Sequence, residues 1–335
     1  MSPPTGDTTT VERRWNTRSS DQGPILKRSD LQFLLPTAQR EPARELYDFF
    51  RWPLSLRDPD RSAGSTVVLY GLPFSGWNRH LAARALWDGV PGVSRVVRMP
   101  AMRGLLQQFA EPDAVVIPMK EAHTRELPFG VRSLAPRPEV VHALDDKQRF
   151  AAYVATNGFG SFCPRTYANW AEAVFPCVLK RTDCVEGHGI SVVCSPSEGE
   201  ALLKSSLYAN KPHLLQEAIP GTRDYCTCCV LKDGQLLWSR TFENEIATPL
   251  TIRRAGENVL CRRSIETPEG IARQIETVLA PLSYSGPCNI DYKLEGERIR
   301  IFEVNARLAG SLLDPPFHEH LQAALACIVA HSTRM

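Results

Sequence analysis

The sequence predicts a small α/β unit followed by a larger α+β region. The β-branched run Ser65–Tyr70 ends at Gly71, helical spacing follows over residues 78–88, and short strand patterns follow over 94–97 and 113–117. Strand, helix and strand in this order are typical of a parallel sheet with crossover helices. From residue 160 to 305 strand patterns dominate and do not alternate regularly with helices, which indicates an α+β arrangement.

Composition excludes several classes of protein. The chain has 335 residues, 39 Lys and Arg against 37 Asp and Glu, and a net charge of +2. This balance argues against a large nucleic-acid surface, although a small anion needs just a few local cations. No apolar run approaches the roughly 20 residues of a membrane span, and residues 1–30 hold no signal-peptide stretch. Ten cysteines without a compact spacing pattern indicate reduced thiols, so we expect a cytoplasmic protein without nucleic-acid or membrane partners.

These patterns divide the chain into three parts. Residues 1–64, rich in Pro, Ser and Thr at the start and polar at the end, are expected to form a leader and linker with some helix. Residues 65–140 form the α/β unit. Residues 141–330 form the α+β region, with one lobe at about 160–215 and another at about 216–330.

The α+β region opens with a helix over 145–156, capped by Asp145 or Asp146, with Phe150 and Val154 on one face. Strands are expected at 177–180, 190–194, 213–217, 225–231, 235–240, 289–294 and 298–305. Helices are expected near 197–205, 268–279 and 319–330. On the strand at 225–231, Cys226 and Cys228 face one side and Cys229 the other, as packed core thiols rather than metal ligands.

The last two of these strands form a hairpin around Glu295-Gly296-Glu297. Burying Ile290 and Tyr292 together with Phe302 and Val304 requires paired positions whose numbers add to an even sum, hence an odd-length loop of three residues. The opposite face then carries the polar side chains of the two strands.

Those polar side chains are Asp291, Glu303 and Asn305, and Arg307 follows two residues later. Two carboxylates and an amide oxygen are ligands that Mg²⁺ prefers, and a nearby arginine can stabilise charge on a transferring phosphoryl group. A solvent-facing hairpin with ordinary charges is the competing interpretation of the hairpin alone.

Upstream segments could hold a nucleotide. Lys180 ends a strand, and a glycine-bearing loop over 186–190 follows it. Backbone N–H groups of such a loop can close over phosphates. The strand exit at 216–221 offers backbone groups to an adenine edge, and Asp224 offers a carboxylate to ribose hydroxyls.

In this order the segments resemble the ATP-grasp superfamily over roughly residues 141–311, with the α/β unit preceding the ATP-grasp fold. The resemblance implies that nucleotide-binding positions are Lys147, Lys180, Glu186, Gly187, His188, Gly189, Gln216, Glu217, Ala218, Ile219 and Asp224. Asp224 stands one position later than the family's ribose-binding acid, and Glu186 and His188 replace the loop's serines. The metal ligands implied are Asp291, Glu303 and Asn305.

The resemblance implies an enzyme that uses ATP and Mg²⁺, with Mn²⁺ as an alternative metal, to activate a carboxylate as an acyl phosphate and join it to an amine. Arg307 and Lys180 are the expected catalytic residues, and a closing lobe would exclude water. For the small-molecule acid and amine, Arg240, Arg307 and Ser311 are the expected contacts, with the arginine pairs at 253–254 and 262–263 as weaker candidates. A kinase that stops at phosphoryl transfer, a peptide-modifying enzyme and a non-catalytic nucleotide-binding protein stay open as alternatives, and so does a homodimer.

Overall fold

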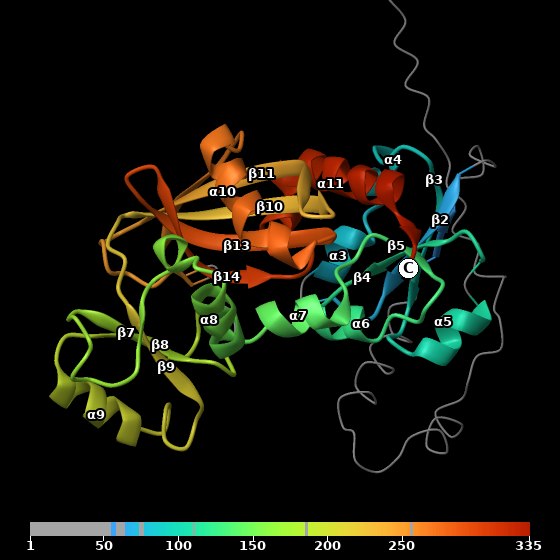
Figure 1. Cartoon of the computed structure of the whole chain (residues 1–335). Coiled ribbons are helices and arrows are strands. Elements are labelled where there is room, and N and C mark those ends of the chain that lie inside the picture. Colours follow the sequence, from blue (N-terminus) through green and yellow to red (C-terminus); the bar gives the residue numbers. More distant parts are fainter. Residues whose placement is uncertain (1–54, 58–63, 74–76, 110, 185–186, 255–256) are drawn as a thin grey trace, which may run out of the picture.

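A computed structural model describes residues 55–57, 64–73, 77–109, 111–184, 187–254 and 257–335. Within them the chain forms three sheets, which lie one after another along the molecule (Figure 1). None of the described helices combines the length and the apolar character that crossing a membrane requires.

The first sheet has the strand order β1-β3-β2-β4-β5-β15. Its members are β1 (Ser55–Arg57), β2 (Ser65–Tyr70), β3 (Val93–Met99), β4 (Val115–Pro118), β5 (Arg132–Ser133) and β15 (Thr333–Arg334). Strands β2 to β5 pair in parallel, as the sequence predicts, whereas β1 and β15 pair antiparallel at the two edges. Val67 to Tyr70 are buried, as expected for a β-branched central strand.

Short helices lie between these strands along the chain or, in the case of α7, follow β5 and lead into the rest of the chain. They are α3 (Trp77–Leu81), α4 (Arg84–Asp88), α5 (Arg103–Phe109), α6 (Glu121–Arg125) and α7 (Pro138–Leu144). The single helix predicted over 78–88 is therefore wrong, because the chain turns between α3 and α4.

The boundaries of the α/β unit also differ from the prediction. Residues 55–57, expected in the linker, form the edge strand β1, and β15 brings the end of the chain to the opposite edge. The helix α11 (His318–His331) packs against α4, β10 and β11, and one core joins buried side chains of the first sheet to those of α11. The α/β unit and the C-terminal lobe are thus joined by a shared core.

The central sheet is antiparallel, with the order β12-β11-β10-β13-β14. Its strands are β10 (Arg223–Lys232), β11 (Gln235–Ile246), β12 (Val259–Ile265), β13 (Gly286–Glu295) and β14 (Arg298–Asn305). The helix α10 (Glu269–Leu279) covers one face of this sheet, and Cys229 of β10 packs in the core beneath it. Cys226 and Cys228 point to the other face and enter the core shared with the first sheet. The predicted division of the three thiols is confirmed.

The hairpin of β13 and β14 brings the predicted polar side chains to one face, but in a register that differs from the prediction. Glu295 pairs with Arg298 across a two-residue turn, so the predicted three-residue loop is wrong. A β-bulge after Asp291 then shifts the register, so that Asp291 pairs with Glu303 and both lie on the same face, as predicted. The bulge also moves Phe302, predicted in the core beside Val304, to the polar side of the hairpin.

The lid is the lobe built on the third sheet, of order β6-β9-β7-β8. It comprises β6 (Thr166–Tyr167), β7 (Cys177–Arg181), β8 (Ile190–Val193), β9 (His213–Glu217) and α9 (Pro196–Lys204). The part of the chain that the structure describes also has four 3-10 turns, at Gly160–Phe162, Ala280–Leu282, Gly310–Leu313 and Pro315–Phe317. The lid has its own core, which includes Tyr167, Leu179 and Tyr208.

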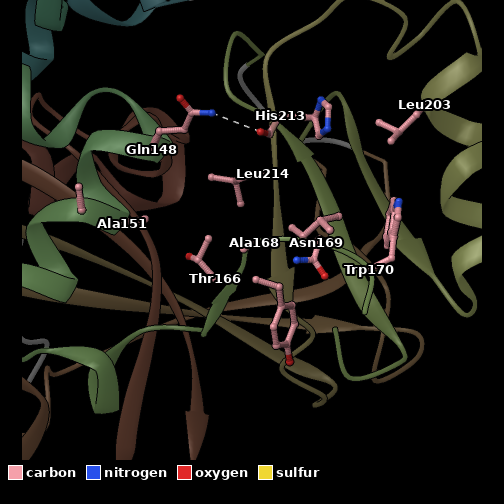
Figure 2. A pocket seen from close by; sticks show the side chains of 12 residues that line it. Gln148, Ala151, Thr166, Ala168, Asn169, Trp170, Leu203, His213 and Leu214 are labelled. Atoms are coloured by element: carbon pink, nitrogen blue, oxygen red, sulfur yellow. Dashed lines mark hydrogen bonds between the residues drawn. The ribbon is translucent and has the colours of Figure 1, made fainter. Parts of the chain in front are cut away.

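The helix α8 (Lys147–Thr156) leads into the lid, and Asp146 caps it by accepting from the backbone N–H groups of Gln148 and Arg149. A hollow of about 600 Å³ separates α8 from the lid sheet (Figure 2). Across it, Gln148 Nε2 donates to the His213 carbonyl oxygen at 3.3 Å. A lobe with its own core and a hollow at its base can change its angle to the central sheet at small cost in packing.

Candidate active site

A cavity of about 680 Å³ lies where the lid, the central sheet and the first unit meet. Most residues predicted for the site line this one cavity: Lys147, Lys180, Gly187, Gln216, Glu217, Ala218, Ile219, Asp224, Asp291, Glu303, Asn305, Arg307 and Ser311. They come from segments more than 150 positions apart in the chain, so the fold brings the predicted set together.

A carboxylate pair lines the cavity: Asp291 on β13 and Glu303 on β14 face each other across the hairpin. Asn305 Nδ2 lies 3.4 Å from Asp291 Oδ2 and 3.3 Å from Glu303 Oε1. Asn289 Nδ2 donates to Asp291 Oδ2 at 3.0 Å. Two adjacent amides therefore fix the orientation of the pair.

Lys180 stands opposite this pair at the end of β7. It is 4% exposed, and its Nζ donates to the Phe302 carbonyl oxygen at 3.2 Å. Burial lowers the pKa of the Lys180 ammonium, against the attraction of Glu303. Burial also opposes the charge of Glu303, but the cations Lys180 and Lys147 outweigh it and lower the pKa of that carboxyl. Burial raises the pKa of Asp291, against the nearby guanidinium of Arg253.

The carboxylate pair fits a divalent metal ion. Two carboxylates on adjacent strands repel each other unless a cation lies between them. Rotating the Asn305 amide by 180° would turn its oxygen toward both, giving three hard oxygen ligands. The described residues contain no cluster of three or more His, Cys, Asp or Glu side chains. A metal here would complete its shell with phosphate or water oxygens, which suits Mg²⁺.

A lysine at the start of α8 and a glycine of the lid lie at the cavity's edge. Lys147 Nζ donates to the Cys184 carbonyl oxygen at 2.7 Å. Gly187 has φ +80°, and a Cβ there would lie 2.6 Å from the Arg253 carbonyl oxygen, so the close approach requires glycine. His188 is exposed, and neither it nor Gly189 lines the cavity. Glu186 lies outside the described residues.

The segment that follows β9 forms another side of the cavity. The Glu217 carboxylate is occupied elsewhere, because it accepts from Arg300 Nη2 at 2.5 Å and from the Arg165 backbone N–H at 3.0 Å. The backbone from Glu217 to Ile219 is thereby held against the cavity. Sequence reasoning missed Arg300, because an arginine on a strand carries no signal of what it will pair with.

Asp224 lies at the start of β10, 6% exposed, between two cations. Lys293 Nζ is 3.6 Å from Asp224 Oδ1, and Arg253 Nε is 3.7 Å from Oδ2. Burial raises the pKa of this carboxyl, against those two cations. Sequence reasoning missed Lys293 and gave Arg253 a weaker role at the substrate.

The far end of the cavity lies toward the first unit. Arg307 Nε is 3.1 Å from Glu121 Oε1, and the guanidinium stacks 5.8 Å from the centre of the Trp77 ring. Ser311 Oγ lies within 3.5 Å of the Cys226 and Cys228 sulfurs.

Two other arginines predicted as substrate contacts, Arg240 and Arg262, lie in different places relative to the cavity. Arg240, the preferred of the two, is absent from the cavity lining, since its guanidinium contacts Glu266 and His320 on another side of the sheet. Arg262 lines the cavity in its place, and its Nη1 donates to Asp314 Oδ2 at 2.6 Å.

No known protein family and no curated protein matches the chain by sequence. Solved structures match its fold. D-alanine–D-alanine ligase from Bacillus anthracis in complex with ATP aligns with a TM-score of 0.51 and 12% identity, covering 79% of this chain and 96% of that enzyme. L-amino acid ligase from Bacillus licheniformis gives 0.52 and 14%, covering 82% and 76%. Phosphoribosylamine–glycine ligase from Thermotoga maritima gives 0.52 and 14%, covering 76% and 70%. The predicted fold is confirmed, because this chain has the ATP-grasp fold that these enzymes share.

Proposed function

We propose that the protein is an ATP-dependent ligase that activates a carboxylate as an acyl phosphate and joins it to an amine. The observation that carries the proposal is the carboxylate pair, Asp291 and Glu303, opposite the buried Lys180 in a cavity closed on one side by the lid. Three compared enzymes of the same fold are named as ligases, and one was solved with ATP.

In this proposal the chain binds and orients ATP. The backbone from Glu217 to Ile219 receives the adenine, and Asp224 lies near the ribose. Lys147 and Lys180 bind phosphate oxygens. Asp291, Glu303 and the Asn305 oxygen would hold Mg²⁺ or Mn²⁺, which supplies charge neutralisation on the phosphates when bound.

The reaction has two steps. A carboxylate oxygen of the acid attacks the γ-phosphorus, and the bond to the β-phosphate oxygen breaks to release ADP. The amine nitrogen then attacks the acyl carbon, inorganic phosphate leaves, and the nitrogen loses a proton. Arg307 stabilises the charge on the transferring group, and a closed lid protects the acyl phosphate from water.

The acid and amine are small molecules that bind at the cavity's far end, near Arg307 and Ser311, with Arg262 replacing Arg240 as a candidate contact. We place the enzyme in the cytoplasm, on the evidence of ten cysteines that form no disulfide among the described residues. A homodimer is compatible with the proposal.

An ADP-release screen over pooled acids and amines, read by mass spectrometry, tests the proposal. A ligase releases phosphate and ADP together with a condensed product, and Asp291→Asn abolishes the release. A stable phosphorylated product in place of an amide would make the protein a kinase. A biological function that persists in Asp291→Asn would indicate a non-catalytic nucleotide-binding protein.

A further inference from the structure

Arg253 lies in the connection between β11 and β12, beside the carboxylate pair. The described backbone is tied on both sides of it. Before it, Asn258 Nδ2 donates to the Ile252 carbonyl oxygen at 2.6 Å, and after it the Arg254 backbone N–H donates to Asn258 Oδ1 at 2.9 Å. The position of the Arg253 side chain in the cavity is therefore built into the connection.

The guanidinium of Arg253 joins two carboxylates. Its Nη2 lies 2.5 Å from Asp291 Oδ1, and its Nε lies 3.7 Å from Asp224 Oδ2. The second oxygen of Asp291 accepts from Asn289 and lies near the Asn305 amide. Both oxygens of Asp291 are thus already engaged.

A metal ion and this guanidinium compete for Asp291. Mg²⁺ binds oxygen at 2.0–2.1 Å. A guanidinium whose Nη2 lies 2.5 Å from the same oxygen would repel the metal in a cavity that excludes much of the water. Binding of the metal through Oδ1 therefore weakens the pair between Arg253 and Asp291 and favours its opening.

We propose that Arg253 is a built-in counter-ion of the carboxylate pair, which the metal–nucleotide complex displaces and a metal ion alone displaces poorly. When a metal ion without nucleotide takes Asp291, the Arg253 guanidinium stays in the cavity with Asp224 as its remaining carboxylate partner. A metal bound to a triphosphate brings anionic oxygens that accept it. Arg253 is a positioning residue in this role, and the inference rests on the proposed metal role of Asp291.

The lid is part of the same arrangement. Gly187 packs so closely on the Arg253 backbone that a Cβ would lie 2.6 Å from its carbonyl oxygen. A movement of the Arg253 backbone therefore requires Gly187 of the lid to move with it. In this way, opening of the Arg253–Asp291 ion pair would be coupled to closure of the lid.

Mn²⁺ titrations followed by electron paramagnetic resonance, without nucleotide and without substrates, test the proposal. We expect Arg253→Met to bind Mn²⁺ at least about tenfold more tightly than the unaltered protein, because close charge pairs of this kind are commonly coupled by that factor or more. The matched control is Arg263→Met on β12, whose guanidinium pairs with Glu243 and is mostly exposed. It should bind Mn²⁺ as the unaltered protein does.

Equal or weaker Mn²⁺ binding by a folded Arg253→Met protein overturns the proposal, as does a gain that persists when Asp291→Asn is added. Should Arg253→Met fail to fold, Arg253→Gln gives the same test, because glutamine removes the positive charge beside Asp291 and keeps a polar side chain in the cavity. Its Mn²⁺ affinity must then exceed that of the unaltered protein. Failure of this titration leaves the ADP-release screen untouched, so the two proposals fail separately.

Discussion

Replacing Arg300 by Met tests whether one buried guanidinium holds the segment proposed to receive adenine. Arg300 is 7% exposed and donates to Glu217, to Glu295 at 2.8 Å and to the Cys163 carbonyl oxygen at 3.1 Å. Removing one partner of a buried ion pair costs roughly 3–5 kcal/mol. Glu295 is 60% exposed and can hydrate, and Glu217 keeps its bond from the Arg165 backbone. We therefore expect a loss of about 2 kcal/mol in the free energy of unfolding.

Urea unfolding, with the slope compared between proteins, measures this loss. The matched control is Arg298→Met, two residues earlier on β14 and exposed, which should change the free energy of unfolding by less than about 0.5 kcal/mol. In the proposed enzyme the Michaelis constant for ATP should also rise about tenfold while kcat changes little. An Arg300→Met protein as stable as the control would refute the reasoning.

Other positions give equally direct tests. Glu303→Gln should lower the rate of ADP formation at least about hundredfold with the fold retained by circular dichroism, and a rate near that of the unaltered enzyme would contradict its metal role. Gly187→Ala should raise the Michaelis constant for ATP, because the added Cβ meets a carbonyl oxygen at 2.6 Å. Gly296→Ala carries the same left-handed strain with nothing within 4 Å, so an equal effect there would show that strain alone is responsible. Burial raises the pKa of the Cys163 thiol to about 12, so roughly 1 molecule in 10⁴ is a thiolate at pH 8. Peptide mass spectrometry after iodoacetamide treatment should find the exposed Cys194 modified and Cys163 unmodified until urea is added.

Local patterns predicted most of the strands and most of the candidate site, but the short strands β5 and β6 and the longer strand β12 were not predicted. The limits of β9 and β14 agree with the prediction to the residue, because alternation and the turns around them are local signals. The β-bulge at β13 and β14 could not be predicted in this way. A three-residue loop places the apolar side chains of both strands on the same face. A two-residue turn combined with a bulge places the polar residues together equally well, and nothing in the sequence distinguishes the two arrangements.

Tertiary pairing explains the rest of the differences. The edge strand Ser55–Arg57 and the terminal strand Thr333–Arg334 are too short to show alternation, and they exist because the first sheet has edges to pair with. The same holds for the substrate arginines. Arg240 and Arg262 lie on neighbouring strands but have different partners. Arg240 contacts His320 and Arg262 contacts Asp314, and both partners are remote in sequence.

The charges of the cavity show why composition was a poor guide to its ligand. Lys180 faces the carboxylate pair, Arg253 binds Asp291, and Arg307 lies beside Glu121. An ATP–metal complex brings both an anion and a cation, so it can exchange partners with groups that are already paired. Exchange of this kind leaves fewer buried charges unpaired than binding into a purely cationic pocket would. A net charge of +2 is therefore compatible with the proposed triphosphate site, and in the proposed enzyme the pairing would favour the metal-bound nucleotide over the free one.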